Sequence, residues 1–398
     1  MNRPRLIIAQ GREKSILRFH PWIFSGAVKR IVDNPQDGDL VDVVASDGTW
    51  LAAGHYQAGE SIVCKVLTFD AVENAHSEEE LLRRRLQSAI DYRRALGFFD
   101  MADTNVFRLV HAEGDFLPGL VCDWYNGVLV LQAHSMGMYR RFPLISNLFH
   151  ELLGERLLSV FDKSGNTCPG LDSSSDRYLF GIEPDEWEIC EHGNRMLINF
   201  FEGQKTGFFV DQRENRKLVH DLAAGHRVMN CFGYTGGFSL AALRGGAEYV
   251  ETVDISKKAI ELCNRNVALN FGSAARHKGT VADVLKYLNG PLSSNFDFVI
   301  LDPPAFAKNH HVLKQGLKGY RTINQRAMEM IQPGGLLMTF SCSQAVSVSD
   351  FRTMVFSAAA GARRRVRIVR VLPHAADHPV SVYHPEGEYL KGLLLEVE

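Results

Sequence analysis

The fold of this chain is decided by one stretch, Val228-Met-Asn-Cys-Phe-Gly-Tyr-Thr-Gly-Gly-Phe-Ser239. Its first residues form a short apolar run, which predicts a buried strand. Gly236 and Gly237 follow, and because glycine has no Cβ they let the backbone approach a ligand closely. The next residues, 238–243, have the composition of a helix. The stretch therefore predicts a strand, a glycine-bearing turn and a helix in succession.

A second strand, Val250 to Asp254, follows this unit and ends in an acid. In nucleotide-type sites the first strand, turn and helix hold the ligand, and an acid at the tip of the next strand binds a pair of ribose hydroxyls. The spacing Gly233-Tyr-Thr-Gly-Gly237 matches neither the dinucleotide fingerprint nor the phosphate-binding loop. A ligand with ribose and adenine but no phosphate, such as S-adenosylmethionine, fits better, although the glycines alone are better explained by a plain tight turn.

From Trp187 onward, strand-like and helix-like segments alternate. This alternation predicts a mostly parallel sheet with helices on both faces. Ligands of such sheets bind at the carboxyl ends of the strands. The residues at these ends are small, acidic or nucleophilic: Phe232 to Gly237, Asp254, Asp283, Asp302-Pro-Pro304 and Ser341-Cys-Ser343. Together they indicate a site much more specifically than any one of them does.

Composition sets outer limits on the protein. Its 398 residues suffice for two or three domains, and 45% apolar with 23% charged residues is ordinary for a soluble globular protein. The basic start, Met1 to Arg5, leads into an apolar run too short for a signal peptide, and no run is long enough to span a membrane, so we expect a cytoplasmic protein. Seven scattered cysteines without a C-x-x-C pair indicate neither a zinc site nor a disulfide framework.

The N-terminal segment, to about Asp70, is expected to be a small β-rich module, with turns at Asp37-Gly38 and Asp47-Gly48. Up to Arg30 it carries seven basic residues against one acid, and His20-Pro-Trp-Ile-Phe24 adds aromatic residues. Because the net charge is only -2, nucleic-acid binding would need a local patch of this kind. The charges fit RNA contacts and a solvated face equally well, whereas the aromatic residues fit a core better.

The central segment is expected to mix helices and strands. A helix is predicted from Glu78 to about Leu96, supported by acid–arginine pairs four residues apart. A hairpin is predicted to turn at Asn126-Gly127, and a further helix to cover Tyr139 to Leu153.

Several motifs of the chain resemble those of one family. The N-terminal ones are Gly11-Arg-Glu-Lys-Ser15 and His20-Pro-Trp22. The later ones are Gly203-Gln-Lys-Thr-Gly207, Asp211-Gln-Arg213, Asn230-Cys-Phe-Gly-Tyr-Thr-Gly-Gly-Phe238, Asp302-Pro-Pro304, Phe340-Ser-Cys-Ser343, Ala375-Ala-Asp-His-Pro379 and Tyr389-Leu-Lys-Gly392. With these motifs the whole chain resembles the ribosomal RNA large-subunit methyltransferase I family, which are S-adenosylmethionine-dependent cytosine-C5 methyltransferases.

The resemblance implies three domains. They are a PUA-like RNA-binding domain over 1–72, an α+β middle domain over 73–186, and a Rossmann-like class I methyltransferase domain over 187–398 with a mostly parallel seven-stranded sheet. The middle domain departs most from the family, around Asp162-Lys-Ser-Gly165, which leaves the choice of target open. A homodimer is implied by the resemblance alone.

The resemblance also implies a mechanism. Carbon 5 of cytosine is a poor nucleophile until a thiolate adds at carbon 6, which is covalent catalysis. Cys342 would be this nucleophile, and Asp302 would hold ring nitrogen N3 in its protonated form. Lys308 or Lys205 would help to deprotonate the thiol, and the base that removes the carbon 5 proton is not identified. A second catalytic cysteine is not expected, because Ala305 follows the Asp-Pro-Pro motif.

For the cofactor, the resemblance implies that Asp254 binds the ribose hydroxyls and Asp283 the adenine amino group. Strand-end acids are also common helix caps, and this competes most for Asp283. The other cofactor-binding residues implied are Asp211, Arg213, Phe232, Tyr234, Thr235, Gly236, Gly237, Asp302 and Pro303.

The implied partner is large-subunit ribosomal RNA, with no membrane and no metal, since the spacing of His374, His378 and His384 fits no standard site. The basic stretch before a helix expected at about 320–331 would contact RNA phosphates or form a mobile solvated loop. The RNA-binding candidates are Arg12, Lys14, Arg18, Trp22, Lys308, Lys314, Lys318 and Arg321. Three alternatives stay open: a guanine N-methyltransferase of the same fold, a non-catalytic RNA-binding assembly factor, and a dinucleotide oxidoreductase.

Overall fold

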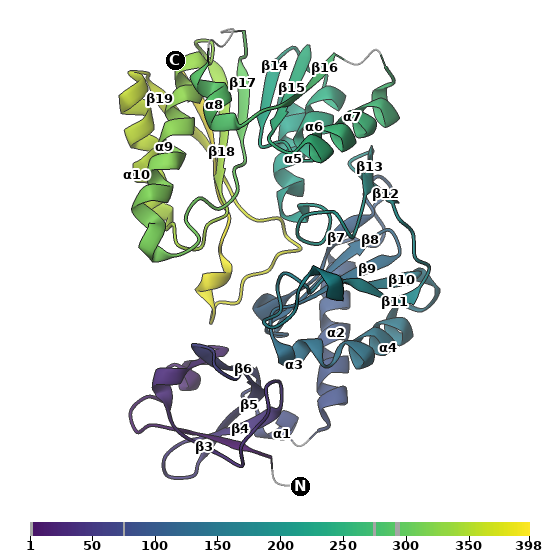
Figure 1. Cartoon of the computed structure of the whole chain (residues 1–398), viewed down its shortest axis with the longest axis vertical. Coiled ribbons are helices and arrows are strands. Elements are labelled where there is room, and N and C mark those ends of the chain that lie inside the picture. Colours follow the sequence, from purple (N-terminus) through teal and green to yellow (C-terminus); the bar gives the residue numbers. More distant parts are fainter. Residues whose placement is uncertain (1–2, 75, 274–275, 291–294) are drawn as a thin grey trace. The chain divides into compact units, whose positions relative to one another are not determined.

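The computed structural model describes residues 3–74, 76–273, 276–290 and 295–398 (Figure 1). The chain forms two compact units. The first comprises Met1–Ile189, Ile198–Asp211 and Ala376–Gly387, and the second comprises Cys190–Leu197, Gln212–Ala375 and Glu388–Glu398. The three domain boundaries expected from the sequence stay a prediction. Among the described residues, no helix has the length and apolar character that crossing a membrane requires.

The first unit begins with a six-stranded sheet of order β2-β6-β5-β4-β1-β3. Its core consists of apolar side chains that alternate along the strands, such as Leu6, Ile8, Val41 and Val43. The β-rich N-terminal module is therefore confirmed. Its strands are β1 Arg5–Ile8, β2 Trp22–Phe24, β3 Val28–Val32, β4 Leu40–Val44, β5 Trp50–Tyr56 and β6 Ile62–Thr68.

A five-stranded sheet of order β11-β10-β9-β8-β7 forms the rest of the first unit. The predicted hairpin joins β8 to β9 at Asn126 and Gly127, whose φ angles of 47° and 94° are those of a tight hairpin turn. Helices α2 and α4 share the apolar core of this sheet. The elements are α1 Ala71–Asn74, α2 Glu78–Ala95, β7 Val106–His111, β8 Leu120–Tyr125, β9 Val128–Ala133, α3 Met136–Tyr139, α4 Phe142–Leu153, β10 Ser159–Asp162 and β11 Arg177–Gly181. A separate hairpin pairs β12 Trp187–Glu191 with β13 Asn194–Ile198.

The segment Ala376–Gly387 is held within the first unit by two hydrogen bonds of Asp377. Arg93 is fully buried and binds both carboxylate oxygens of Asp115, at 2.5 and 2.9 Å, in the fork geometry that suits a guanidinium. It also donates to the carbonyl of Asp377 at 2.7 Å, while the Asp377 carboxylate accepts from the backbone N–H of Arg108 at 2.8 Å. A segment far along the chain therefore completes this unit.

The second unit is built on the seven-stranded sheet that the sequence predicts. Its order is β16-β15-β14-β17-β18-β20-β19, and every described pairing is parallel except those of β20. The strands are β14 Arg227–Cys231, β15 Tyr249–Asp254, β16 His277–Val281, β17 Phe298–Leu301, β18 Gly335–Ser341, β19 Val366–Leu372 and β20 Lys391–Val397.

Helices cover both faces of this sheet (Figure 1). The residues of strand β17 enter two apolar cores, one on each face of the sheet. Phe298 and Ile300 belong to the core that includes α5 and α6. Val299 and Leu301 belong to the core that includes α8, α9 and α10. Because both faces are covered, the strand is continuously apolar. The helices are α5 Arg213–Leu222, α6 Gly237–Arg244, α7 Lys257–Phe271, α8 Val284–Asn289, α9 Leu313–Met330 and α10 Val348–Ala362.

The predicted start of α9 is wrong, because the helix begins at Leu313 and not near Tyr320. Gly316 and Gly319 weaken the helical signal of the sequence. In the structure, however, a Cβ on Gly316 would lie 2.7 Å from that of Ala307, so the glycine allows close packing of the helix on the preceding loop. Much of the basic stretch therefore lies on a helix, and the expectation of a loop is corrected there.

Candidate active site

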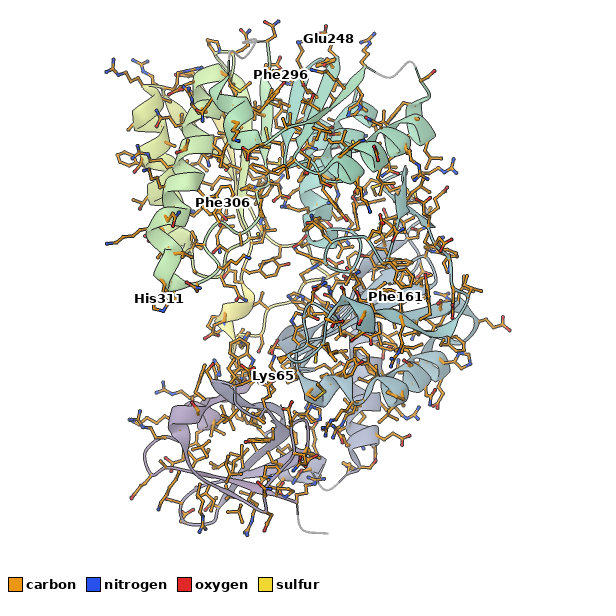
Figure 2. The ribbon with its side chains drawn as sticks, in the orientation of Figure 1. Lys65, Phe161, Glu248, Phe296, Phe306 and His311 are labelled. Carbon is orange, nitrogen blue, oxygen red and sulfur yellow. The ribbon has the colours of Figure 1, made fainter. Side chains whose placement is uncertain are left out.

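The order of the sheet reverses between β14 and β17. From β14 the chain moves outward to β15 and β16, then returns to β17 on the other side of β14 and continues to β18. The topological switch point of the sheet therefore lies between β14 and β17, and sheets of this type bind ligands in the crevice outside the carboxyl ends of the strands at that point. Figure 2 shows Phe306, which follows β17, at the opposite end of the sheet from Phe296 and Glu248.

The turn after β14 has an unusual backbone. Phe232 and Tyr234 have φ angles of 59° and 48°, in the left-handed region that bulky residues rarely adopt. Such strained positions cluster at functional sites. Gly236 has a φ of 89°, and a Cβ there would lie 2.4 Å from the sulfur of Cys263. The turn therefore needs glycine at this position for both conformation and space.

Buried hydrogen bonds support the turn from below. The side-chain amide of Asn230 donates to the Ser239 hydroxyl at 2.9 Å, which lies 2.6 Å from the hydroxyl of Thr252. That hydroxyl lies 2.8 Å from Nε2 of His277. Burial lowers the pKa of His277 to about 4, so the ring is neutral at pH 7. The network links β14, α6, β15 and β16 and keeps the strand ends in register.

Asp254 occupies the position expected of the ribose-binding acid. Its half-buried carboxylate accepts from the backbone N–H of Tyr234 at 3.0 Å and from that of Ser256 at 2.8 Å. These two bonds orient the carboxylate and join the tip of β15 to the turn after β14. Asp283 instead caps α8 by accepting from the backbone N–H of Lys286 at 3.0 Å. This cap uses one carboxylate oxygen of Asp283. The role of Asp283 in binding adenine stays a prediction.

Two apolar side chains at this edge were not identified from the sequence. Ile255 is 69% exposed and Val281 is 51% exposed, and Val281 pairs with Asp254 in the β15–β16 register. Exposed apolar groups beside a strand-end acid provide a surface on which a flat aromatic ring packs. The sequence signal was available, since an isoleucine directly follows the strand-end acid.

Cys342 lies at the carboxyl end of β18, beside the end of β17. It is half-buried, and its thiol donates to the carbonyl of Pro303 at 3.8 Å. Cys231 and Cys263 are fully buried, as the sequence interpretation expected, and burial raises the pKa of both thiols. Of the seven cysteines only Cys342 and Cys190 are partly accessible, and of these two only Cys342 lies at the strand ends that form the crevice.

A cation that the sequence interpretation did not consider lies beside Cys342. Lys391 pairs with Ser341 across β18 and β20, and its Nζ donates to the carbonyl of Ser343 at 2.5 Å and to that of Tyr389 at 2.7 Å. Burial lowers the pKa of Lys391, and the negative charge of a Cys342 thiolate opposes that shift. The sequence carried a weak signal, because Lys391 belongs to the motif at residues 389–392.

The loop after β17 presents Asp302 and is held by Tyr320 of α9. The Tyr320 hydroxyl accepts from the backbone N–H of Phe306 at 3.3 Å and donates to the carbonyl of Pro304 at 3.5 Å. Burial raises the pKa of Tyr320 to about 12, so its proton is retained. The hydroxyl of Ser343 donates to the carbonyl of Ala307, which ties the same loop to the end of β18. Asp302 and Cys342 are thus presented by two connected loops.

Two further cofactor candidates lie away from these strand ends in the sequence. Asp211 belongs to the first unit and forms an ion pair with Lys205 at 3.4 Å. Arg213 belongs to the second unit, is fully buried, and contacts Glu214 at 3.3 Å. Their roles, and those of Thr235, Gly237 and Pro303, stay predictions. Lys205, expected near the thiol, also belongs to the first unit, whereas Lys308 is exposed on the loop before α9.

The RNA-binding candidates fall into two exposed groups and one partly buried residue. Lys314, Lys318 and Arg321 follow one another at helical spacing on α9 and are exposed, as is Lys308. Trp22 is half-buried, and its indole N–H donates to Glu113 at 2.8 Å, so its RNA-binding role stays a prediction. Phe24 is 47% exposed, so the expectation that it lies in a core is wrong. The other exposed group, near η1 Ile16–Arg18, consists of Arg12, Lys14 and Arg18.

Two family models match the chain. One is described as an S-adenosylmethionine-dependent methyltransferase and matches residues 170–378, just over half of the chain. The other is a PUA-like domain and matches residues 6–69. The chain is also similar along its whole length to solved structures. One is assigned as a SAM-dependent methyltransferase from Streptococcus mutans, with 22% identity, a TM-score of 0.84 and full coverage of both chains. Another, solved with SAH, has 23% identity, a TM-score of 0.85 and the same coverage.

Curated relatives share the full length. A protein of Klebsiella pneumoniae named ribosomal RNA large subunit methyltransferase I is 38% identical over 403 residues, which cover 99% of this chain and 98% of the relative. The protein of the same name from Escherichia coli is 38% identical over 399 residues, with 99% of each chain covered. The chain therefore belongs to the ribosomal RNA large subunit methyltransferase I family, with a PUA-like domain at its N-terminus and an S-adenosylmethionine-dependent methyltransferase domain.

Proposed function

We propose that this enzyme methylates carbon 5 of a cytosine in large-subunit ribosomal RNA through a covalent adduct between Cys342 and carbon 6. One observation carries the proposal: the partly accessible thiol of Cys342 contacts the Asp302 loop at Pro303, and the ammonium of Lys391 binds the backbone of the next residue, Ser343. The names of the relatives and the PUA-like domain support ribosomal RNA as the substrate, and that substrate supports a cytoplasmic location. Homodimerisation stays a prediction.

The residues at the strand ends fit S-adenosylmethionine. The Asp254 carboxylate is held in place to accept from the ribose hydroxyls, and the exposed side chains of Ile255 and Val281 offer an apolar surface for adenine. The turn from Phe232 to Gly236 would hold the methionine end, where backbone groups approach closely. When bound, S-adenosylmethionine supplies an electrophilic methyl group, which carbon 5 of the activated base accepts.

Cys342 would act first, by adding as a thiolate to carbon 6 of the base. The thiolate is the reactive form of cysteine, and a neighbouring cation favours it. Lys391 supplies that cation, because its Nζ is fixed by the carbonyls of Tyr389 and of Ser343, the residue that follows Cys342. This assigns to Lys391 the role that the sequence interpretation gave to Lys308 or Lys205.

Asp302 would hold a proton at ring nitrogen N3, so that the negative charge that develops in the ring on addition is neutralised. Its loop is fixed by Tyr320 and Ser343, which keeps the carboxyl group and the thiol at a constant separation. After carbon 5 has been methylated, loss of its proton releases the base and restores the Cys342 thiolate.

The target base must leave its stack to reach this crevice, at a cost of about a few kcal/mol that is smallest in loops. We propose that exposed cations contact the RNA phosphates at the same time. Lys314, Lys318 and Arg321 present three charges along one helix, next to the loop that carries Asp302. Phosphate contacts of this kind position RNA without reading its sequence.

The test is to incubate the protein with unmodified large-subunit ribosomal RNA and methyl-labelled S-adenosylmethionine, and then to identify the labelled nucleoside. We expect 5-methylcytidine, and no label with Cys342→Ala. Cys190→Ala is the matched control, since Cys190 is the other partly accessible cysteine, and it should remain active. Label in a methylguanosine with an active Cys342→Ala variant would contradict the proposal, because guanine N-methylation needs no cysteine nucleophile.

A further inference from the structure

The first unit contains a cavity of about 190 Å³ that the proposed chemistry does not use. It is lined by the N-terminal module, by the region after β7, and by the segment Ala376–Gly387 that the two hydrogen bonds of Asp377 hold within this unit. Each of these three parts contributes one partly exposed aromatic ring. Phe19 is 47% exposed, Phe116 is 51% exposed and Tyr383 is 45% exposed.

The aromatic rings that line the cavity pack against one another and against a guanidinium. Phe19 lies edge-on to Tyr383, with 5.3 Å between the ring centroids, and edge-on to Phe69 at 5.4 Å. The guanidinium of Arg85 lies 5.5 Å from the centroid of Phe116, and Glu73 holds it there at 2.8 Å. Large exposed rings combined with a stacked guanidinium are typical of surfaces that bind flat aromatic ligands.

Two of these rings are carried by strained backbone. Phe19 has a φ of 64° and Phe116 a φ of 58°, both in the left-handed region. Each of these residues ends a tight turn. The backbone N–H of Phe19 donates to the carbonyl of Ile16 at 2.9 Å, and the backbone N–H of Phe116 donates to the carbonyl of Glu113 at 3.3 Å. Glycine would adopt these conformations without strain. Phenylalanine at both positions, with its ring partly exposed, therefore costs stability without filling a core, which points to a role in binding.

The cavity also has a polar wall. The Glu113 side chain is 11% exposed and accepts from the indole N–H of Trp22 at 2.8 Å, with the Lys65 ammonium at 3.6 Å. Burial raises the pKa of Glu113, but the Lys65 charge and the Trp22 hydrogen bond outweigh burial and lower it. An ionised carboxylate beside aromatic rings accepts hydrogen bonds from the amino or imino groups of a nucleobase.

We infer that this cavity binds one unstacked base of single-stranded RNA, which packs against the rings of Phe19, Phe116 and Tyr383. The inference rests on the proposed RNA substrate and adds a second base contact to it. Charge supports RNA over an apolar protein segment: up to Arg30 the chain carries seven cations against one acid, and Arg18 directly precedes Phe19. All cavity residues belong to the first unit, whereas Cys342 and Asp302 belong to the second, so this base is not the one methylated.

The Phe116→Gly variant distinguishes an effect on RNA binding from an effect on folding. The substitution relieves the left-handed strain and removes one stacking surface, so the variant should fold at least as well as the unaltered protein while it binds RNA more weakly. The matched control is Phe180→Leu, which alters a 40% exposed phenylalanine of the same unit outside the cavity. Tyr383→Leu is a second test, because leucine keeps the apolar contact and loses the aromatic face.

The measurement is the fluorescence anisotropy of the full-length protein with a labelled single-stranded RNA of mixed sequence, about 12 nucleotides long. Loss of base stacking should raise the Kd by about 5- to 100-fold for Phe116→Gly and Tyr383→Leu. Phe180→Leu should leave the Kd unchanged, as should all three variants with duplex RNA of the same length.

An unchanged Kd for both cavity variants would overturn the inference and would leave an apolar protein segment as the occupant. An equal loss of affinity for single-stranded and duplex RNA would overturn it as well, since a paired base cannot enter. Failure of the proposed function is distinguishable, because it appears as label in a nucleoside other than 5-methylcytidine while the anisotropy results are unaffected.

Discussion

Lys391 faces Ser341 across the antiparallel pairing of β20 with β18, and its ammonium binds the carbonyl of Ser343, so its contacts lie on both sides of Cys342. Strand β20, which lies between β18 and β19, thus brings a buried positive charge to the one partly accessible thiol of the crevice. A thiol in such surroundings ionises more readily than one in an apolar core.

Replacing Lys391 with methionine should make methylation depend more strongly on pH. Loss of the cation favours the thiol over the thiolate, so a higher pH is needed to form the nucleophile, and the acidic limb of the kcat/KM profile should move upward. We expect roughly a 10- to 100-fold loss near pH 7 that shrinks as the pH rises.

Lys391→Arg is the control that retains the charge, and it should keep most of the activity and the position of the acidic limb. Lys308→Met removes an exposed cation of the same region and should not shift that limb. A deficit of Lys391→Met that is the same at every pH would show that the side chain only supports the structure.

Asp254→Asn should weaken the binding of S-adenosylmethionine. The substitution keeps the shape of the side chain but removes its charge and one of its two acceptor oxygens, both of which are engaged by backbone N–H groups. Hydrogen bonds to charged groups contribute about 1.5–3 kcal/mol each, so the Kd measured by calorimetry should rise by about 10- to 100-fold.

The control is Asp297→Asn, which alters an acid before β17, at the amino end of the sheet, where it accepts from the backbone N–H of Arg227 at 2.8 Å. The Asp297→Asn variant should bind S-adenosylmethionine with the same Kd as the unaltered protein. If both variants weakened binding equally, the effect would come from stability and not from the site.

Gly236→Ala should disrupt the turn after β14 more than an ordinary glycine substitution does. The new Cβ would lie 2.4 Å from the Cys263 sulfur at a φ of 89°, which combines a clash with backbone strain of about 1–2 kcal/mol. Calorimetry with S-adenosylmethionine should show binding that is strongly weakened or lost. Gly225→Ala has a similar φ of 76° but meets no atom within 4 Å, so it carries the strain alone and should retain binding.

Glu78→Gln should destabilise the first unit at neutral pH. Burial raises the pKa of Glu78, but hydrogen bonds from His55 and Arg141 outweigh burial and lower it to about 2. Because the folded pKa lies below the unfolded value, the carboxylate contributes its full stability above about pH 4.5 and loses it as the pH falls toward 2. The variant should therefore lose about 2–3 kcal/mol at pH 7 and much less at pH 3.

Tryptophan fluorescence measures this effect selectively, since Trp22, Trp50, Trp124 and Trp187 all belong to the first unit. Urea unfolding gives the free energy of unfolding at pH 7 and at pH 3. Glu80→Gln removes an exposed partner of Arg84 and should leave stability essentially unchanged at either pH, because solvent screens a surface ion pair. A pH-independent loss in Glu78→Gln would contradict the assignment.

Local patterns predicted most of the fold because they report burial directly. The apolar run that begins at Val228 indicated a buried strand, and the strand-end positions of Asp254 and Cys342 followed from the alternation of elements. The start of α9 could not be predicted in this way, because the contact of Gly316 with Ala307 outweighs the low helix propensity of glycine.

The features of the site and of the cavity that the sequence did not predict depend on contacts between residues far apart in the chain. Lys391 reaches Cys342 only through the register of the antiparallel pairing between β20 and β18, which the sequence of the strand does not specify. The bond of Arg93 to the carbonyl of Asp377 joins residues 284 positions apart and brings Tyr383 to the cavity of the first unit. No local sequence pattern predicts either of these two contacts.

The central claim is the covalent bond between Cys342 and cytosine, and RNA that contains 5-fluorocytidine tests it most directly. Fluorine at carbon 5 cannot leave as a proton does, so the adduct should persist after methylation. The account predicts an RNA–protein complex that survives denaturation, with the nucleotide on the Cys342 peptide in mass spectrometry, and no such complex with Cys342→Ala. Methylation of unmodified RNA to 5-methylcytidine by Cys342→Ala, or an adduct on any other residue, would contradict it.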